Sequence, residues 1–428
     1  MRPSPGRLAA ARALVQLEQR GGHADEVYGQ HARGVEGAER RLGWALVLGV
    51  ERHRFRIDHS LNRHLSRRPQ ELDPPVRAAL RCAVFQIWEL DRVPERAAVH
   101  QAVEVTRALG APRAAGLVNA ALRSLQRSPE RAGEPRDEAT IHSLLPWILK
   151  RMPMGAAAAF NREPSLAIRP RRPGLAEQLA RDGVELAVPE PPLDNTGALL
   201  VAGRDPTGLS GWAEGWFAIQ DAAAQAVVRL LDPQPGERVL DACAAPGGKT
   251  FAIADAVGEG GHVVALDVSA ERLELLRSEA ARLGLERVAV LAGDALRCLG
   301  TAEHEGKYDR VLLDAPCSAL GTLRRHPELR WQRRPADLPR FAALQQSLLR
   351  AAAAAVKPGG TLVYAVCSFA DEEGAEVVDR FVEQHLAFER VPIGAAWGGA
   401  RTPVGDLLTW PTQGPWDSFY AAVLRRSS

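Results

Sequence analysis

The chain has 428 residues, of which 46% are hydrophobic and 25% charged, which indicates a globular protein with more than one domain. No run of about 18 apolar residues predicts a membrane span, and the N-terminal residues lack the apolar core of a secretion signal. Five cysteines, few and odd in number, indicate reduced thiols rather than a disulfide framework. We therefore expect a cytoplasmic monomer with no membrane partner and no metal.

The net charge is only +2, but the charges are unevenly distributed along the chain. Residues 1–150 hold 24 Lys and Arg against 17 Asp and Glu, whereas the remainder holds 30 against 35. An excess of positive charge in the first third points weakly to an anionic partner such as a nucleic acid.

The first 128 residues predict an all-α domain. Apolar residues recur at helical spacing in the segments 7–19, 76–90, 97–109 and 115–125, and no alternating strand pattern interrupts them. A polar stretch with two prolines and a glycine predicts a linker at 129–141. The mixed, Pro-rich residues 142–218 predict a small α+β connector subdomain.

From residue 219 to 428, strands alternate with helices. Continuous apolar strands separated by helices predict a Rossmann-like α/β domain, with a seven-stranded, mostly parallel sheet covered on both faces. The expected parallel strands are 238–242, 262–267, 288–292, 310–314 and 361–366. A last pair of strands near 407–410 and 418–424 is expected to close one edge.

The segment VLDACAAPGGKT (239–250) runs from an expected strand through a Gly-rich turn into a helix. Such a turn brings backbone N–H groups and a helix N-terminus close to a ligand. A P-loop would need Gly where Cys243 stands, and a dinucleotide fingerprint needs three glycines in another spacing, without Pro246 inside the run. A tight turn that binds nothing is the alternative.

Three aspartates stand at the ends of the strands that follow: Asp267, Asp294 and Asp314. The carboxyl ends of parallel strands surround the usual ligand crevice of an open α/β sheet. Asp267 could accept hydrogen bonds from ribose hydroxyls, and Asp294 could meet an adenine amino group. Each could instead cap a helix, as Asp267 could before the helix expected from residue 270. Their shared placement favours a nucleoside ligand.

Two cysteines follow neighbouring strands: Cys317 in DAPCSALG and Cys367 in VYAVCSF. The topology therefore predicts both thiols over one cleft, although a free Cys is more often a small buried hydrophobe. A thiolate that adds to C6 of cytosine makes C5 nucleophilic enough to take the methyl group of S-adenosylmethionine (SAM). Asp314 could stabilise positive charge on the base, which must be unstacked to reach the pocket. Spacing does not settle which Cys attacks.

The segments GWFAIQDAAAQ, LDACAAPGGKT, DAPCSALGTLRRHPE and YAVCS resemble the RNA cytosine-C5 methyltransferases of the Sun/Fmu family, from about residue 215 to the C-terminus. The resemblance implies SAM as cofactor, Cys367 as the nucleophile, Cys317 in product release and Asp314 at the base. In DNA cytosine methyltransferases the nucleophile instead stands at the position of Pro316-Cys317. The residues implied to bind SAM are Cys243, Ala244, Ala245, Pro246, Gly247, Gly248, Lys249, Asp267, Asp294 and Asp314.

Residues 7–127 resemble the NusB-type RNA-binding domain in GRLAAARALVQLEQ, DPPVRAALRCAVFQIWEL and LVNAALRSL. This fusion implies the bacterial branch that methylates small-subunit (16S) ribosomal RNA. A tRNA substrate and a non-catalytic RNA-binding or ribosome-assembly factor are the alternatives. The chain departs from the family pattern at Ala319, where Gly is usual, at Val366, where Thr is usual, and at PWDSFYAAVLRR, where a DGFF-like segment is usual.

The segment LRRHPELRWQRR (323–334) concentrates five arginines, a histidine and a tryptophan directly after Cys317. Arginine can pair with phosphates and tryptophan can stack on an unpaired base, so this composition predicts RNA contacts. A solvated charged loop is the alternative. The expected contact residues are Arg324, Arg325, Arg330 and Trp331.

Overall fold

The computed structural model describes residues 3–128, 135–202 and 205–428. It consists of two compact units. Unit 1 contains Met1–Arg162 and Leu323–Arg333, and unit 2 contains Glu163–Thr322 and Arg334–Ser428. The expected linker at 129–141 lies partly outside the described residues, and residues 142–162 and 323–333 belong to unit 1 rather than to the domains expected for them.

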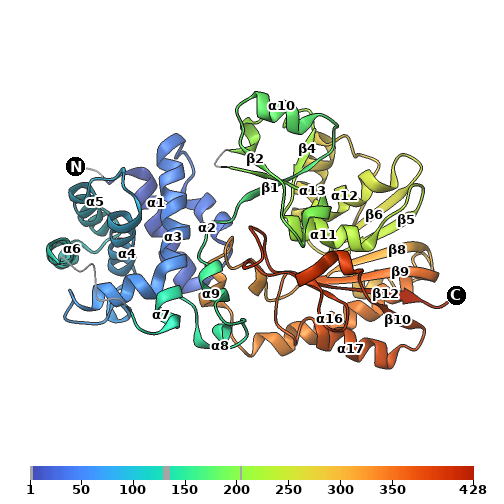
Figure 1. Cartoon of the computed structure of the whole chain (residues 1–428). Coiled ribbons are helices and arrows are strands. Elements are labelled where there is room, and N and C mark those ends of the chain that lie inside the picture. The colour runs from blue at the N-terminus through green and yellow to red at the C-terminus, as the bar shows by residue number, and fades with distance from the viewer. Residues whose placement is uncertain (1–2, 129–134, 203–204) are drawn as a thin grey trace. The chain divides into compact units, whose positions relative to one another are not determined.

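Unit 1 is helical, as the apolar spacing predicts (Figure 1). Helix α3 packs on both α1 and α4, and α5 packs between α4 and α6. The α-helices of unit 1 are α1 (Pro5–Arg20), α2 (Ala24–His31), α3 (Gly37–Asn62), α4 (Pro74–Glu89), α5 (Glu95–Ala108), α6 (Ala115–Arg127), α7 (Glu138–His142), α8 (Pro146–Leu149), α9 (Ala156–Ala159) and α15 (Leu329–Gln332).

Small residues let the long helices of unit 1 approach closely. The buried face of α1 is rich in alanine, with Ala10 and Ala13 fully buried. In α3, a Cβ atom added to Gly49 would lie 2.0 Å from the ring of Phe85 in α4, so only glycine fits at this crossing. Close packing of this kind supplies the hydrophobic stabilisation that helix propensity alone does not.

Unit 2 begins with a small antiparallel sheet in the order β2-β3-β1-β4. Its core contains Ile168, Val201 and Phe217, together with residues of the short helix α10 (Leu175–Arg181). The strands are β1 (Leu166–Pro170), β2 (Leu186–Ala187), β3 (Leu199–Val201) and β4 (Phe217–Ile219).

The larger sheet of unit 2 has the order β10-β12-β9-β8-β5-β6-β7, with the short β11 paired to β12. Strands β5 to β9 are parallel, and β12 runs antiparallel between β9 and β10. The predicted mostly parallel sheet is confirmed, but in the described residues it has eight strands rather than the expected seven, because β10 adds an edge strand outside β12. The strands are β5 (Arg238–Ala242), β6 (His262–Asp267), β7 (Ala289–Ala292), β8 (Tyr308–Asp314), β9 (Val356–Val366), β10 (Phe388–Val391), β11 (Leu407–Leu408) and β12 (Tyr420–Arg426).

Helices cover both faces of this sheet (Figure 1). Alternate residues of β5 point to opposite cores, so Val239 packs with one set of helices and Leu240 with the other. The first set is α11 (Ala222–Leu231), α12 (Gly248–Val257) and α13 (Ala270–Arg282), and the second is α14 (Ala295–Cys298), α16 (Asp337–Ala355) and α17 (Ala375–Gln384). The order of the strands reverses between β5 and β8, which is where open α/β sheets bind ligands.

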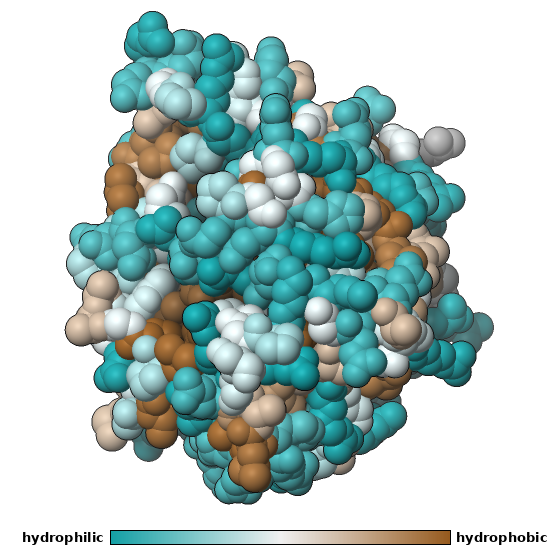
Figure 2. All heavy atoms as spheres, turned by 90° about the vertical axis from the view of Figure 1, so that its right-hand side faces the viewer, coloured by the Kyte–Doolittle hydropathy of each residue, from teal (hydrophilic) through white to brown (hydrophobic). Residues whose placement is uncertain are grey.

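Hydrophilic side chains cover most of the surface that Figure 2 presents, with separate apolar patches between them. Within the described part of the chain, no helix is both long and apolar enough to cross a membrane.

Candidate active site

The Gly-rich turn leaves β5 and is bonded to the end of β6. Cys243 has a φ of 70°, and its N–H and that of Ala244 donate to the Leu266 carbonyl, at 2.8 and 2.9 Å. Gly247, with a φ of 111°, starts α12, and a Cβ there would lie 2.5 Å from the ring of Phe251. The glycine is therefore required by both its backbone angle and its surroundings.

Asp267 joins this turn to the start of α13. Its Oδ2 accepts the Ala245 N–H at 3.0 Å, and its Oδ1 accepts the Ser269 N–H at 2.8 Å. The cap of α13 is Ser269, whose hydroxyl accepts the Arg272 N–H, so the helix-cap interpretation of Asp267 is wrong. The carboxylate is nearly buried and retains lone pairs for a further donor.

Asp294 does cap a helix. Its Oδ1 accepts the Leu296 N–H at 3.0 Å at the start of α14. The carboxylate is nevertheless about half exposed and belongs to the wall of the cavity described next, so capping leaves it accessible to a ligand.

A cavity of about 440 Å³ lies at the carboxyl ends of β5, β6, β7, β8 and β9. Three apolar side chains that line it, Val268, Leu296 and Leu344, are exposed, which suits a planar apolar base, whereas Asp267 suits sugar hydroxyls. The residues present thus fit a nucleoside. The lining consists of Cys243, Ala245, Leu266, Asp267, Val268, Arg272, Gly293, Asp294, Ala295, Leu296, Asp314, Ala315, Pro316, Cys317, Ala319, Leu344, Leu348 and Cys367.

The two cysteine thiols predicted over one cleft are in direct contact. The Sγ atoms of Cys317 and Cys367 lie 3.4 Å apart, and both line the cavity. The hydrogen bond with Cys367, together with burial, raises the pKa of Cys317 well above its ordinary value. Cys317 is therefore a protonated thiol at neutral pH. Burial also raises the pKa of Cys243, which makes that third cysteine an unreactive thiol.

A partly buried ion pair lies beside the thiols. Lys249, in the first turn of α12, donates to Asp314 Oδ2 at 2.6 Å, and its ammonium lies 5.0 Å from the ring centre of Phe419. Burial alone would lower the pKa of Lys249, but the Asp314 carboxylate outweighs it and, with a smaller contribution from Cys367, raises the pKa. The lysine thus carries its positive charge next to the dithiol.

Not every residue expected to bind SAM reaches the cavity. Ala244, Pro246, Gly247, Gly248 and Lys249 are not among its lining residues, and the last of these acts on it through Asp314.

The sequence analysis missed two residues of the site. Arg272 lines the cavity and donates to the Ala245 carbonyl, and Glu373 bonds the residues that follow both cysteines. Both stand in runs of charged residues that read as solvated helix surface, so no local signal marks them.

The arginine-rich segment belongs to unit 1, and the expectation that Arg324 and Arg330 contact RNA is wrong. Their exposed fractions are 1% and 0%. The Arg330 guanidinium donates to the carbonyl of Phe160 at 2.7 Å and to Asn161 Oδ1 at 2.8 Å, among other oxygens. The Arg324 carbonyl accepts from Arg52 at 2.9 Å. For Arg325 the RNA contact stays a prediction.

A kink in α3 explains how Arg330 is accommodated. The helix departs from helical geometry at His53, and the Arg56 N–H donates to Ser143 Oγ at 3.2 Å. The Arg52 carbonyl, one residue before the kink, accepts from Arg330 at 3.1 Å. Because the acceptors come from distant parts of the chain, no local pattern around Arg330 indicates this burial.

Trp331 is also engaged within unit 1. Its indole N–H donates to the Glu51 carbonyl at 2.9 Å, and its ring packs against Phe55 and Arg54. An RNA contact by Trp331 stays a prediction. Any base stacked on this ring would join the protein groups that already contact it.

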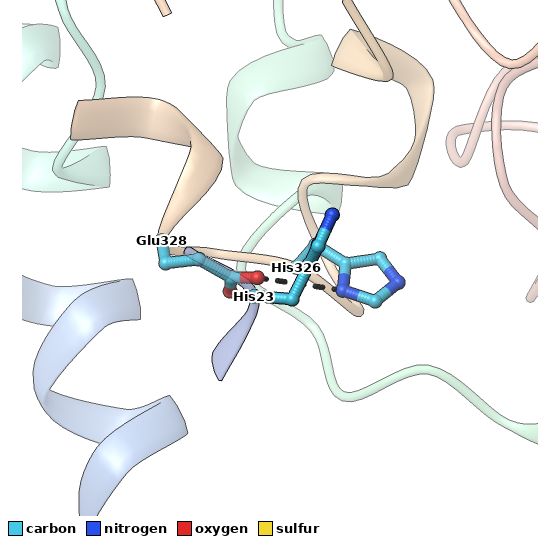
Figure 3. A group of neighbouring side chains, drawn as sticks. All are labelled: His23, His326 and Glu328. Carbon is cyan, nitrogen blue, oxygen red and sulfur yellow. Dashed lines mark ion pairs between the residues drawn. The ribbon is translucent and has the colours of Figure 1, made fainter. Parts of the chain in front are cut away.

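The segment has a second point of attachment at the start of α2. Figure 3 shows the side chains of His23, His326 and Glu328 turned toward one another. Glu328 is buried, accepts the Ala24 N–H at 3.2 Å and lies 3.5 Å from His326 Nδ1. The potential metal-ligand atoms of the three residues lie within 4.8 Å of one another, but the Ala24 bond already occupies one carboxylate oxygen.

Comparison with known families finds two matches along the chain. A model described as 16S rRNA methyltransferase RsmB/F matches residues 228–425, and a NusB family model matches residues 4–127. The second match agrees with the resemblance of the helical segment.

Full-length relatives agree with these matches. The ribosomal RNA small subunit methyltransferase B of Pseudomonas putida is 35% identical over 434 residues, covering 98% of both chains. The probable ribosomal RNA small subunit methyltransferase B of Synechocystis sp. is 35% identical over 416 residues, covering 91% of this chain and 92% of its own length. The crystal structure of PH0851 matches with a TM-score of 0.81 and 27% identity, covering 100% of this chain and 99% of the other.

Proposed function

Because this chain belongs to the 16S rRNA methyltransferase RsmB/F family, we propose that it transfers a methyl group from SAM to C5 of a cytosine in 16S ribosomal RNA, through an adduct between Cys367 and C6. The chain is a methyltransferase, and the SAM-dependent reaction is the one that its family carries out. The observation that supports the adduct is the contact of two thiols in a nucleoside-sized cavity.

The cofactor would occupy the part of the cavity nearest the Gly-rich turn. Asp267 would accept hydrogen bonds from the ribose hydroxyls, and Asp294 would meet the adenine amino group. Val268 and Leu296, both exposed at the cavity, would lie against the adenine ring. SAM supplies an electrophilic methyl group on a positively charged sulfur.

Cys367 would supply the nucleophile. As its sulfur bonds to C6, the C5–C6 electron pair becomes available at C5, which takes the methyl group. A water molecule then takes the C5 proton, the electron pair of that C–H bond restores the C5–C6 double bond, and the S–C6 bond breaks with its electron pair on the Cys367 sulfur. The Lys249 ammonium lies close to Cys367 and pairs with Asp314, which would balance positive charge at the base.

Cys317 would act as the proton-carrying partner in release. Its raised pKa keeps it protonated while Cys367 attacks, and at 3.4 Å it can return a proton to the Cys367 sulfur when that leaves C6. The raised pKa of Cys317 supports giving the two thiols different roles, which sequence spacing left open.

Replacing each cysteine in turn tests the proposal. With 16S rRNA and labelled SAM, Cys317→Ala should accumulate an RNA–protein adduct that withstands denaturation, because attack proceeds while release fails. Cys367→Ala should form neither adduct nor product. Cys298→Ala, a cysteine outside the cavity lining, is the matched control and should behave like the unaltered chain.

An adduct with Cys367→Ala but none with Cys317→Ala would reverse the roles. Methyl transfer to purified tRNA instead of 16S rRNA would correct the substrate. Intact SAM binding without transfer to any RNA would favour a non-catalytic assembly factor.

A further inference from the structure

One buried carboxylate connects the two loops that carry the thiols. Glu373 is fully buried in the turn before α17. Its Oε1 accepts the Ser318 N–H at 2.7 Å, and its Oε2 accepts the Ser368 hydroxyl at 2.7 Å and also the Ser318 hydroxyl. Since Ser318 follows Cys317 and Ser368 follows Cys367, the carboxylate holds the neighbour of each thiol.

Two further contacts fix Glu373 and the loop before Cys317. Gln345 of α16 donates from one amide nitrogen to Glu373 Oε1 at 3.2 Å and to the Pro316 carbonyl at 3.0 Å. The hydroxyl of Tyr364, three residues before Cys367 in β9, donates to the Glu373 main-chain carbonyl at 2.5 Å. The Glu373 side chain is thus tied to both cysteine loops, and its backbone to β9.

A carboxylate suits this position because it accepts at both oxygens. Four donor groups converge on Glu373, and a neutral amide could accept at only one of its two polar atoms. Buried hydrogen-bonded groups of this kind keep one arrangement only while all partners remain satisfied.

We propose that Glu373 is a positioning residue, which sets the Cys317–Cys367 separation by holding Ser318 and Ser368 together. Its importance for methyl transfer rests on the proposed function. A misplacement of about 1 Å can lower the rate of an enzyme by a factor of about 100. The negative charge of Glu373 also contributes to the raised pKa of Cys317, after the hydrogen bond with Cys367 and burial.

The first test does not depend on catalysis. Diamide takes two electrons and two protons from a pair of thiols and becomes a hydrazine as the S–S bond forms, so its rate reports how close the two sulfurs lie. The Cys317–Cys367 bond is followed by peptide mass spectrometry. We expect Glu373→Ala to slow its formation at least tenfold, and Glu373→Gln, which keeps the shape of the side chain, to slow it less. An unchanged rate in both variants would overturn the proposal.

Asp406→Asn is the matched control. Asp406 is also a fully buried carboxylate of unit 2, but it accepts from Tyr420 and bonds neither cysteine loop among the described residues. This variant should form the disulfide at the rate of the unaltered chain. If Glu373→Ala does not fold, Glu373→Gln decides. Equal slowing by Asp406→Asn would mean that loss of any buried charge suffices, which would also overturn the proposal.

The pH dependence of Cys317 alkylation supplies a second test, because a residue that only stabilises the fold would not change it. Removing a nearby negative charge favours the thiolate, so alkylation of Cys317 in Glu373→Gln should begin at lower pH than in the unaltered chain. In Asp406→Asn the alkylation profile should stay in place. If the pH profile of Cys317 alkylation does not shift in Glu373→Gln, the proposed influence of Glu373 on Cys317 is contradicted.

Methyl transfer is measured last. In Glu373→Ala, kcat should fall about 100-fold while the SAM Kd and the RNA KM change less than threefold. If Glu373→Ala slows disulfide formation but the unaltered chain transfers no methyl group, Glu373 keeps its positioning role and the proposed function is removed. Full activity in Glu373→Ala would refute the positioning role of Glu373 and would not affect the proposed function.

Discussion

Replacement of Arg330 by alanine should destabilise unit 1 and leave RNA binding intact. The guanidinium donates to the carbonyls of Arg52, His142, Ser143, Phe160 and Leu323 and to Asn161 Oδ1. Burial lowers the pKa of Arg330 to about 9, so the group is still charged at neutral pH. Six oxygens would lose a charged donor.

The size of the effect follows from these contacts. A buried acceptor left unpaired costs about 1–3 kcal/mol, but six such terms do not add fully because water can enter the vacated space. Loss of one partner of a buried charged group costs about 3–5 kcal/mol, which we take as the expected destabilisation. For a unit of this size that corresponds to a fall in Tm of roughly 6–20 °C.

Thermal unfolding followed by circular dichroism at 222 nm measures this change. Arg107→Ala is the control, because its guanidinium is half exposed and, within the described ranges, pairs only with Glu104 of the same helix. Its effect should therefore stay within about 0.5 kcal/mol. RNA affinity is compared well below either Tm. An Arg330→Ala protein with unchanged Tm and weakened RNA binding would refute the burial and restore the RNA contact.

Three further predictions concern unit 2. Asp267→Ala should weaken SAM binding at least tenfold by calorimetry, and unchanged affinity would remove Asp267 from the site. Ala319 has a φ of 59°, so Ala319→Gly should stabilise by about 0.5–1 kcal/mol in urea unfolding, and a loss of stability would contradict the strain. Burial raises the pKa of Asp241 to about 7, above the 3.8 of an unfolded chain, so its stabilising contribution is complete below about pH 4 and lost as pH rises through 7. Asp241→Asn should flatten the stability curve over that interval, and an unchanged slope would contradict the shift.

Local sequence patterns were sufficient for the central strands and the thiol pair. The observed β5 and β6 have the expected bounds because buried parallel strands form continuous apolar runs between breakers. The placement of Cys317 and Cys367 over one cleft follows from strand order, since β8 and β9 are neighbours in the sheet. The edge strand β10 is short and carries Glu389 and Arg390 at its centre. It therefore lacks the alternating apolar pattern that would predict a strand.

Features that depend on distant partners were not predictable. Arg330 looks like a surface residue until its acceptors from three other segments are in place. Glu373 stands in an acidic run, and only the fold brings Ser318 to it. Asp294 was open to two interpretations, and the structure supports both a helix cap and a cavity wall.

The return of Leu323–Arg333 to unit 1 has a consequence for biosynthesis. Folding during translation proceeds from the N-terminus as the chain leaves the ribosome. Unit 1 cannot be completed after residue 162, because the guanidinium that satisfies its interior carbonyls emerges only with residue 330. Unit 1 therefore stays incomplete while residues 163–329 are synthesised. A fragment ending at residue 162 would therefore lack the donor for the carbonyls of Arg52, His142 and Phe160.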